Sequence, residues 1–185
     1  MTHETERLIL HPWAEADAGS LYEYAKDDRV GPSAGWPPHT SVENSLEIIR
    51  TVLSEPETYA VCLKGDNRAI GSIGLMVGAQ SNLHLPDTEG EIGYWIGVPF
   101  WGQGLIPEAV RALIRYAFED LHLQALWCCY ADGNGKSRRV QEKCGFSYHH
   151  TERDVHWKLM DRILTEHITR LTRDQWRGTR ADQFP

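Results

Sequence analysis

The stretch Trp95–Glu108, WIGVPFWGQGLIPE, decides the fold, because it runs from an apolar strand through a Gly-x-Gly turn directly into an amphipathic helix. Gly102 and Gly104 permit a tight turn and a close approach of the backbone to a ligand, and Pro107 stands where a first helical residue tolerates a missing N–H. The free amides of the turn and the positive end of the helix dipole then face the same point. The stretch therefore predicts an anion site for a phosphate-bearing ligand.

A second motif, NGKSRRVQEKCGF at Asn134–Phe146, makes this interpretation more specific. It combines a polar start, a short helix and a terminating Gly-Phe pair. It follows Gln124–Tyr130, a continuous apolar run that predicts a buried strand with a parallel neighbour. A Gly-x-Gly turn alone is often plain strand-to-helix punctuation, whereas two spaced motifs are harder to obtain by chance.

Hydrophobic periodicity predicts the remaining elements, and the Gly- and Pro-rich segment Gly31–Thr40 is predicted to be a loop. The predicted helices are Glu15–Asp28, Ser41–Leu53 and Pro107–Leu121. The predicted strands are a first strand ending at Leu8–Leu10, then Thr58–Leu63, Ala69–Val77, Glu91–Val98, Phe146–Asp154 and Asp161–Leu171.

The length of 185 residues fits one domain with a real core, and no shift in composition marks a linker. We expect a single domain over residues 1–177 and a frayed tail over 178–185. No apolar run is long enough to span a membrane, and the N-terminus lacks the features of a secretory signal. A cytoplasmic protein without a membrane partner is the expectation.

The formal net charge is −7, from 26 acidic and 19 basic residues, which argues against a nucleic-acid surface. The charge favours a cationic partner such as an amine, although a solvated acidic surface explains it equally well. The four cysteines include the adjacent pair Cys128 and Cys129 in an apolar run, which indicates buried thiols rather than disulfides. Neither the cysteines nor the scattered histidines have metal-site spacing, so no metal is expected.

These motifs resemble the GCN5-related N-acetyltransferase (GNAT) family, and within it the Rim-type branch of ribosomal-protein N-terminal acetyltransferases. The segments ETERLILHPW, EIGYWIGVPFWGQGLIPEAVRALIRYAF and NGKSRRVQEKCGF, with a final strand ending near Arg173, follow that branch's order and spacing over most of the chain. The resemblance implies an α+β fold. Its mixed central sheet has about six or seven strands, is splayed at the cofactor site and is flanked by about four helices.

The resemblance also implies acetyl-CoA as the acyl donor. Its pyrophosphate would lie on the amides of the turn, and its pantetheine would pair with the strand Tyr94–Val98, with the Ile96 N–H stabilising the oxyanion. Asn134 matches a pantetheine-binding asparagine and is equally good as a helix cap. The implied cofactor-binding residues are Tyr94, Trp95, Ile96, Val98, Gly102, Gln103, Gly104, Leu105, Ile106, Pro107, Asn134, Ser137 and Arg138.

The catalytic residues implied by the resemblance are Glu91, Ser137 and Ile96. Glu91 would take the amine's proton through water, with Glu89 as the second candidate. Ser137 or water would stabilise the departing thiolate, with Tyr130 as a more distant candidate. The chain departs from the family pattern where a tyrosine commonly acts as general acid, because Gln141 lies near that place and cannot give up a proton. It departs again in the turn, where Trp101 and Ile106 occupy the first and last places of the motif.

Substrate choice is expected to depend on Trp36 and His39 in the Gly- and Pro-rich loop and on Glu89. The leading hypothesis is transfer of an acetyl group to a protein or peptide N-terminal α-amine by direct attack on the thioester. The alternatives are a small amine, such as a polyamine, amino acid or amino antibiotic, and a non-catalytic acyl-CoA-binding module. Edge strands near the C-terminus are compatible with a homodimer.

Overall fold

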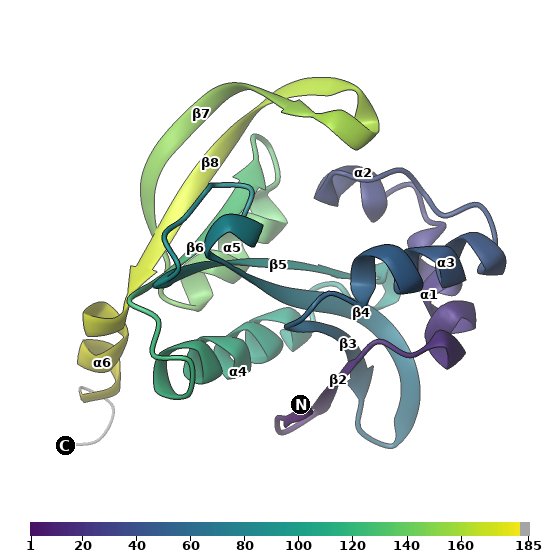
Figure 1. Ribbon diagram of the computed structural model, residues 1–185, viewed down its shortest axis with the longest axis horizontal. Helices are drawn as coiled ribbons and strands as arrows, with labels where there is room; N and C mark the ends of the chain where they lie inside the picture. The colour runs from purple at the N-terminus through teal and green to yellow at the C-terminus, as the bar shows by residue number, and fades with distance from the viewer. Residues whose placement is uncertain (182–185) are drawn as a thin grey trace. The chain divides into compact units, whose positions relative to one another are not determined.

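The structure is a computed structural model that describes residues 1–181. Its strands form a mixed sheet in the order β1-β2-β3-β4-β5-β6-β8-β7, accompanied by α-helices, so the predicted α+β class is confirmed (Figure 1). The strands are β1 (His3–Glu4), β2 (Leu8–Pro12), β3 (Thr58–Leu63), β4 (Asp66–Val77), β5 (Glu89–Ile96), β6 (Ala125–Ala131), β7 (Ser147–Trp157) and β8 (Arg162–Thr172). The helices are α1 (Ala18–Ala25), α2 (Gly31–Ala34), α3 (Val42–Ile48), α4 (Leu105–Glu119), α5 (Gly135–Lys143) and α6 (Arg173–Ala181).

The contacts divide the chain into two compact units, each assembled from separate segments. The first unit contains residues 1–74, 94–112 and 156–162, and the second contains residues 75–93, 113–155 and the chain from Ile163 onward. Strands β4 and β5 and helix α4 each contribute residues to both units.

The first unit is built on antiparallel strands. Strand β2 pairs with β3 from Leu8↔Leu63 to Pro12↔Tyr59, and β3 pairs in turn with β4. Alternate residues of β2 point into the core, where Leu8 and Leu10 are fully buried. Helix α1 packs against α3, as Figure 1 shows. The core cluster of this unit comprises Trp13, Ala18, Leu21, Ala25, Ile49, Ala60, Cys62 and Ala69.

The second unit contains the parallel strand pair that the apolar run predicted. Strand β5 pairs with β6 in parallel at Glu89↔Ala125 and Glu91↔Trp127, which confirms the predicted parallel neighbour. Strand β6 pairs antiparallel with β8, and β7 follows β8 at the edge of the strand order. Buried strands of this kind need apolar residues on both faces, as in ALWCCYA.

The structure differs from the predicted elements at several places. The strand predicted over Glu91–Val98 ends at Ile96, because Val98–Phe100 turn into a 3₁₀ helix with Pro99 in its first turn. The segment predicted as a loop contains the short helix α2, because Pro32 is accepted in its first turn and Gly35, with φ of +93°, ends it in the left-handed conformation. Helix α4 begins at Leu105, two residues before the predicted start at Pro107. Among residues 1–181 there are eight strands and six α-helices, more than the expected numbers, because short elements such as β1 and α2 escaped the periodicity.

The C-terminal part of the chain is helical as far as the structure describes it. Helix α6 extends to Ala181 and so includes the first residues of the predicted tail, while residues 182–185 lie outside the described range. Over the described residues, we find no helix with the length and apolar character needed to cross a membrane. Over the same range, no group of three or more His, Cys, Asp or Glu residues is arranged to hold a metal ion.

Candidate functional site

The Gly-x-Gly turn of the first unit has the conformation that an anion site requires. Gly102 and Gly104 have φ of +77° and +75°, a left-handed backbone conformation that residues other than glycine rarely adopt. A Cβ on Gly102 would meet no atom within 4 Å, so the backbone there faces open space. Helix α4 starts at Leu105, directly after the turn, so the amides of Gly104 to Ile106 belong to its N-terminal end and the Gln103 amide lies in the turn before it.

Arg7 and Glu108, which the sequence analysis missed, brace this turn. The Arg7 guanidinium donates from Nη1 to the carbonyl oxygen of Gln103 (3.0 Å) and from Nε to Glu108 Oε2 (2.7 Å). Glu108 also accepts hydrogen bonds from the Thr5 hydroxyl and the Arg7 backbone amide. Burial alone would raise the pKa of Glu108, but these hydrogen bonds outweigh it and hold the pKa below its usual value. A cation therefore lies beside the turn, although Trp101 stands where the family motif has Arg or Gln.

Trp101 connects the turn to the end of strand β5. Its indole Nε1 donates to the carbonyl oxygen of Ile96 at 2.9 Å. The next amide, that of Gly97, donates to the Ile70 carbonyl of β4 at 2.8 Å. Because successive residues of an extended strand present their amides to opposite edges, the Ile96 N–H faces away from β4. This is the direction that an oxyanion donor on β5 needs.

The parallel ladder between β5 and β6 is short. In the described chain it pairs residues 89–91 of β5 with residues 125–127 of β6, although β5 continues to Ile96 and β6 to Ala131. Just beyond the ladder, the Cys128 thiol donates to the Ile92 carbonyl oxygen at 3.3 Å, where a ladder amide would otherwise bind. The ladder thus ends before Tyr94–Ile96, the part of β5 that the resemblance assigns to the pantetheine.

Two of the predicted acceptor-binding residues form an aromatic group in the first unit. The Trp36 ring lies 5.2 Å from His39 and 5.5 Å from Trp95, measured between centroids. His39 Nδ1 is 2.8 Å from the hydroxyl of Ser45, and burial lowers the pKa of His39. The structure therefore brings Trp36 and His39 to the residue that directly precedes Ile96 on β5.

Glu91, in the second unit, is a buried carboxylate whose two oxygens have different surroundings. Its exposed fraction is 6%. Oε2 accepts hydrogen bonds from the Ser81 hydroxyl (2.8 Å) and the Asn82 amide (3.0 Å), whereas Oε1 faces the Cys129 thiol at 3.7 Å. Burial raises the pKa of Glu91, the nearby Glu166 acts in the same direction, and the hydrogen bonds oppose the shift. A carboxylate with a raised pKa is a stronger proton acceptor than a solvated one.

Glu89 is engaged in a different cluster of the second unit. It accepts hydrogen bonds from Trp127 Nε1 (2.5 Å) and from Arg170 Nη2 (3.0 Å). The Arg170 guanidinium also lies over the Trp127 ring, 4.9 Å from its centroid. These contacts join β5, β6 and β8, and contact of Glu89 with an acceptor stays a prediction.

The second motif forms helix α5 and surrounds a buried glutamine. Asn134 caps the helix, its Oδ1 accepting from the Ser137 amide at 3.1 Å. Gln141 is only 1% exposed. Its Nε2 donates to the Cys129 carbonyl (3.0 Å) and to Ser137 Oγ (3.2 Å), and its Oε1 accepts from the Thr169 hydroxyl (2.7 Å). The position expected to carry an aromatic acid therefore holds an amide that ties α5 to β6 and β8.

Arg138, predicted to reach the cofactor's phosphates, forms an ion pair with Glu142 one turn along α5, with Nε and Oε1 2.7 Å apart. Both side chains are exposed, so the pair is weak and able to exchange partners. A cavity of about 230 Å³ is lined by Tyr130, Arg138, Glu142, Phe146, Tyr148 and Thr169. Contact of Arg138 with phosphate stays a prediction.

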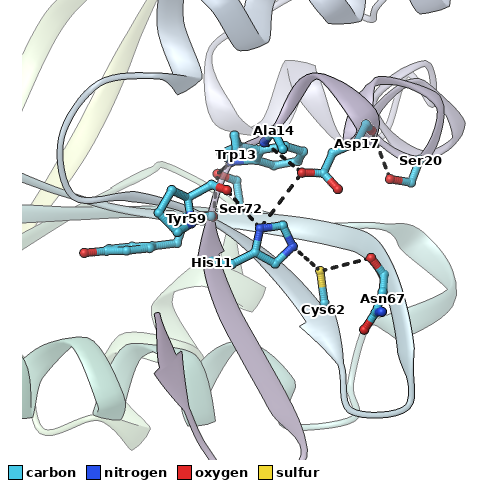
Figure 2. Close-up of polar contacts among 10 residues, drawn as sticks. His11, Trp13, Ala14, Asp17, Ser20, Tyr59, Cys62, Asn67 and Ser72 are labelled. Carbon is cyan, nitrogen blue, oxygen red and sulfur yellow. Dashed lines mark hydrogen bonds and ion pairs between the residues drawn. The ribbon is translucent and has the colours of Figure 1, made fainter. Parts of the chain in front are cut away.

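A cysteine, a histidine and an aspartate line up elsewhere in the first unit (Figure 2). His11 Nε2 lies 3.3 Å from Cys62 Sγ, and its Nδ1 lies 4.0 Å from Asp17 Oδ2. The Pro12 carbonyl, 2.9 Å from Nδ1, can only accept, so Nδ1 carries a proton. The Cys62 thiol also contacts the Asn67 carbonyl oxygen, at 3.8 Å. Burial, reinforced by Asp17 and Asp66, raises the pKa of Cys62 to about 12. The thiol stays protonated, so this group is a structural contact and not an activated nucleophile.

The mixed sheet, the short parallel ladder and the Gly-x-Gly turn before α4 define an acetyltransferase type of α+β domain. Residues 7–147 match the family model described as "Acetyltransferase (GNAT) domain". The chain therefore belongs to the GNAT family.

Comparison with individual proteins agrees with this family. Over 65 residues the chain is 51% identical to "Putative ribosomal N-acetyltransferase YdaF" of Bacillus subtilis (strain 168), a match that spans 35% of the chain and 36% of that relative. It is 27% identical over 179 residues to "Uncharacterized N-acetyltransferase p20" of Bacillus licheniformis, which covers 94% of the chain and 97% of the relative.

Solved structures share the fold. A GNAT-family acetyltransferase from Bacillus anthracis has a TM-score of 0.82 at 19% identity, covering 94% of this chain and 99% of that one. The microcin C7 self immunity acetyltransferase MccE, in complex with acetyl-CoA and AMP, has a TM-score of 0.75 at 18% identity, covering 90% of this chain and 93% of that one.

Proposed function

We propose that this protein is an acetyl-CoA-dependent N-acetyltransferase that acts on the N-terminal α-amine of a protein or peptide. The observation that carries the proposal is the Gly-x-Gly turn. Its two glycines have left-handed backbone conformations and lead directly into the N-terminus of α4. The cofactor is supported by family membership and by the acetyl-CoA complex of MccE. The protein acceptor is supported by the similarity to "Putative ribosomal N-acetyltransferase YdaF".

The residues of the turn fit a pyrophosphate group. The donors are the amides of Gln103, Gly104, Leu105 and Ile106, whereas Pro107 has no N–H to offer. Open space in front of Gly102 leaves room for an anion, and the Arg7 guanidinium adds positive charge beside the turn. Acetyl-CoA, when bound, supplies an activated acyl carbonyl. Tyr94 and Trp95 at the end of β5, and Val98 in the 3₁₀ turn that follows it, would flank its pantetheine.

The acceptor amine must lose a proton before or during attack, and we assign Glu91 as the general base that takes it. Ser81 and Asn82 hold Oε2, which leaves Oε1 as the oxygen that receives the proton through water. An α-amino group has a pKa of about 8, against about 10.4 for lysine, so a carboxylate of modest basicity suffices for a protein N-terminus. The Ile96 N–H would stabilise the oxyanion, and Ser137 the departing thiolate.

Three of the four cysteines are poorly suited to form an acyl-enzyme, which favours direct attack on the thioester. Burial raises the pKa of Cys62, Cys128 and Cys129, and Glu91 raises the values of Cys128 and Cys129 further. These thiols therefore remain protonated near neutral pH, and a thiol is a poor nucleophile compared with its thiolate.

The aromatic group of Trp36, His39 and Trp95 is our candidate for the acceptor site of the first unit. Tryptophan faces attract cations, and the net charge of −7 favours the approach of an ammonium group. Glu89 is our acceptor-binding candidate in the second unit, where Trp127 and Arg170 now hold it.

The proposal is tested by measuring CoA release with matched acceptors. Peptides with a free N-terminus are compared with the same peptides blocked at the α-amine, with polyamines, with amino acids and with amino antibiotics. We expect kcat/KM for the free peptides to exceed that for the blocked peptides by about a hundredfold or more. A preference for a small amine would replace the acceptor class, and acetyl-CoA binding without turnover on any amine would identify a non-catalytic module.

A further inference from the structure

We propose that Gln141 is a positioning residue that directs the Ser137 hydroxyl proton toward the departing sulfur of the acyl donor. This inference rests on the proposed function, in which Ser137 stabilises the thiolate. It goes beyond that function by assigning a role to a side chain that has no acid–base chemistry of its own.

The orientation of the Gln141 amide is fixed from both ends. The Cys129 carbonyl can only accept a hydrogen bond, so the group 3.0 Å from it must be the Nε2 amine. At the other end, Oε1 accepts from the Thr169 hydroxyl at 2.7 Å. A flipped amide would bring two oxygens together at Cys129 and is therefore excluded.

This orientation determines how Ser137 bonds to Gln141. An amide nitrogen has no lone pair available to accept, so Nε2 donates its second hydrogen to Ser137 Oγ at 3.2 Å. The serine oxygen is the acceptor in this pair, and its own proton points away from Gln141. The spacing of four residues on α5 places the two side chains on one face of the helix.

The surroundings strengthen the arrangement. Gln141 is 1% exposed, and a hydrogen bond in a region of low dielectric constant is stronger than the same bond in water. A hydroxyl group that accepts one hydrogen bond becomes a better donor of another, because the bonds polarise one another. The Ser137 amide is held separately by Asn134 Oδ1, so the start of α5 is fixed in place. The Gln141–Ser137 pair would thus direct a hydroxyl proton at the departing sulfur, as the tyrosine hydroxyl does in the family pattern.

A glutamine that merely tied α5 to the sheet would make the same contacts with Cys129 and Thr169 but would not depend on Ser137. The test is therefore a double-mutant cycle with Q141M, S137A and the double variant, measuring kcat and the KM for acetyl-CoA on a peptide acceptor. We expect Q141M to lower kcat about tenfold with the KM unchanged within about twofold. In the S137A background, Q141M should lower kcat no further. A second loss of similar size in that background would overturn the proposal.

Controls keep the outcome interpretable. Thermal unfolding of each variant checks the fold, and Q124M is the matched control, because Gln124 is exposed and donates to the His122 carbonyl. If Q141M does not fold, T169V replaces it, since this variant removes the hydroxyl that holds the oxygen end of the amide, together with its 3.3 Å contact to the Cys128 carbonyl. T169V alone should lower kcat less than Q141M does, and in the S137A background it should lower kcat no further. A further loss in that background would overturn the proposal.

The failure of the inference and the failure of the proposed function are distinguishable. Absence of acetyl transfer by the wild-type protein would refute the function itself. An S137A enzyme with unchanged kcat would remove Ser137 from the chemistry and overturn the Gln141 role, while leaving the acetyl transfer in place.

Discussion

The Gly-x-Gly turn of the first unit and the Glu91–Gln141 region of the second unit use different chemistry. The turn presents backbone amides, fixed by two left-handed glycines and the start of α4. The second region presents buried side chains, in which Glu91 and Gln141 are held by hydrogen bonds from or to neighbouring strands and loops.

This difference explains why departures from the family motif have unequal consequences. In the turn, replacement of the usual Arg or Gln by Trp101 leaves every amide in place, and Arg7 adds a cation from another part of the chain. In the second unit, where the resemblance implies a tyrosine near Gln141, the proposed chemistry depends on the identity of the side chains. Substitutions at backbone positions should therefore affect binding, and substitutions in the side-chain region should affect turnover.

The largest effect is expected for Gly104→Val. The left-handed conformation at this position costs a β-branched residue about 1–2 kcal/mol or more, so the turn should relax and withdraw its amides. We expect the Kd for acetyl-CoA, measured by titration calorimetry, to rise about a hundredfold. Gly19→Ala is the control, because Gly19 lies in α1 with nothing within 4 Å of an added Cβ. Normal acetyl-CoA binding by the valine variant would show that the turn is not the binding site.

Glu91→Gln should separate turnover from binding. We expect kcat to fall at least about tenfold with the Kd for acetyl-CoA unchanged, because the base is lost but no cofactor contact is. A variant with normal kcat would eliminate Glu91 as the base.

The same variant has a predicted signature in stability. Because the pKa of Glu91 is raised in the fold, the protonated form is favoured, and the free energy of unfolding should fall as pH rises from the ordinary value of 4.5 through the folded value. The amide can keep an acceptor oxygen toward Ser81 and Asn82 without a buried charge. E91Q should therefore unfold at a higher temperature than the wild type at neutral pH and at a similar temperature at low pH, as checked by thermal scans.

Ser81→Ala should have a smaller effect, visible in the pH profile. The Ser81 hydroxyl stabilises the ionised form of Glu91, so its removal should raise the pKa of that carboxyl further and move the acid limb of kcat to higher pH. The other titratable groups that interact with Glu91 are Cys128 and Cys129 on β6 and Glu166 on β8, and all three are unchanged in this variant. Ser147→Ala, at an exposed position of β7, is the control. An unshifted acid limb would mean that Glu91 does not control the profile.

The smallest effect is expected for Arg7→Gln. Its side chain is 45% exposed, so its charge beside the turn is largely screened. We expect the Kd for acetyl-CoA to rise about threefold at low salt and to approach the wild-type value at high salt. A loss independent of salt would point instead to collapse of the turn when the contact with Gln103 is removed.

The sequence supported the fold well because its decisive signals are local. Periodicity over α4 and the continuous apolar run of β6 depend on neighbouring residues, and both elements occur within two residues of their predicted ends. The loop prediction at Gly31–Ala34 was wrong because a helix of four residues is too short to show a period.

The candidate site was predicted only where a motif carries it. The turn and Asn134 were found as short patterns, whereas Arg7 braces Glu108 across 101 residues of sequence. No spacing rule connects residues so far apart. Gln141 was placed near the expected tyrosine, but its burial was not predicted, because it stands in the strongly polar helix GKSRRVQEK. Its contacts come from strands β6 and β8, which only the folded chain brings to it.

The most direct test of the account is thermal unfolding of the wild-type protein and of Gly104→Val with and without acetyl-CoA. At a hundredfold excess over Kd, binding to the native state should add about 2.7 kcal/mol to the free energy of unfolding, a shift of a few degrees for a domain of this size. The account predicts this shift for the wild type and its loss in the variant. Equal shifts in both proteins, or no shift in the wild type at millimolar acetyl-CoA, would contradict it.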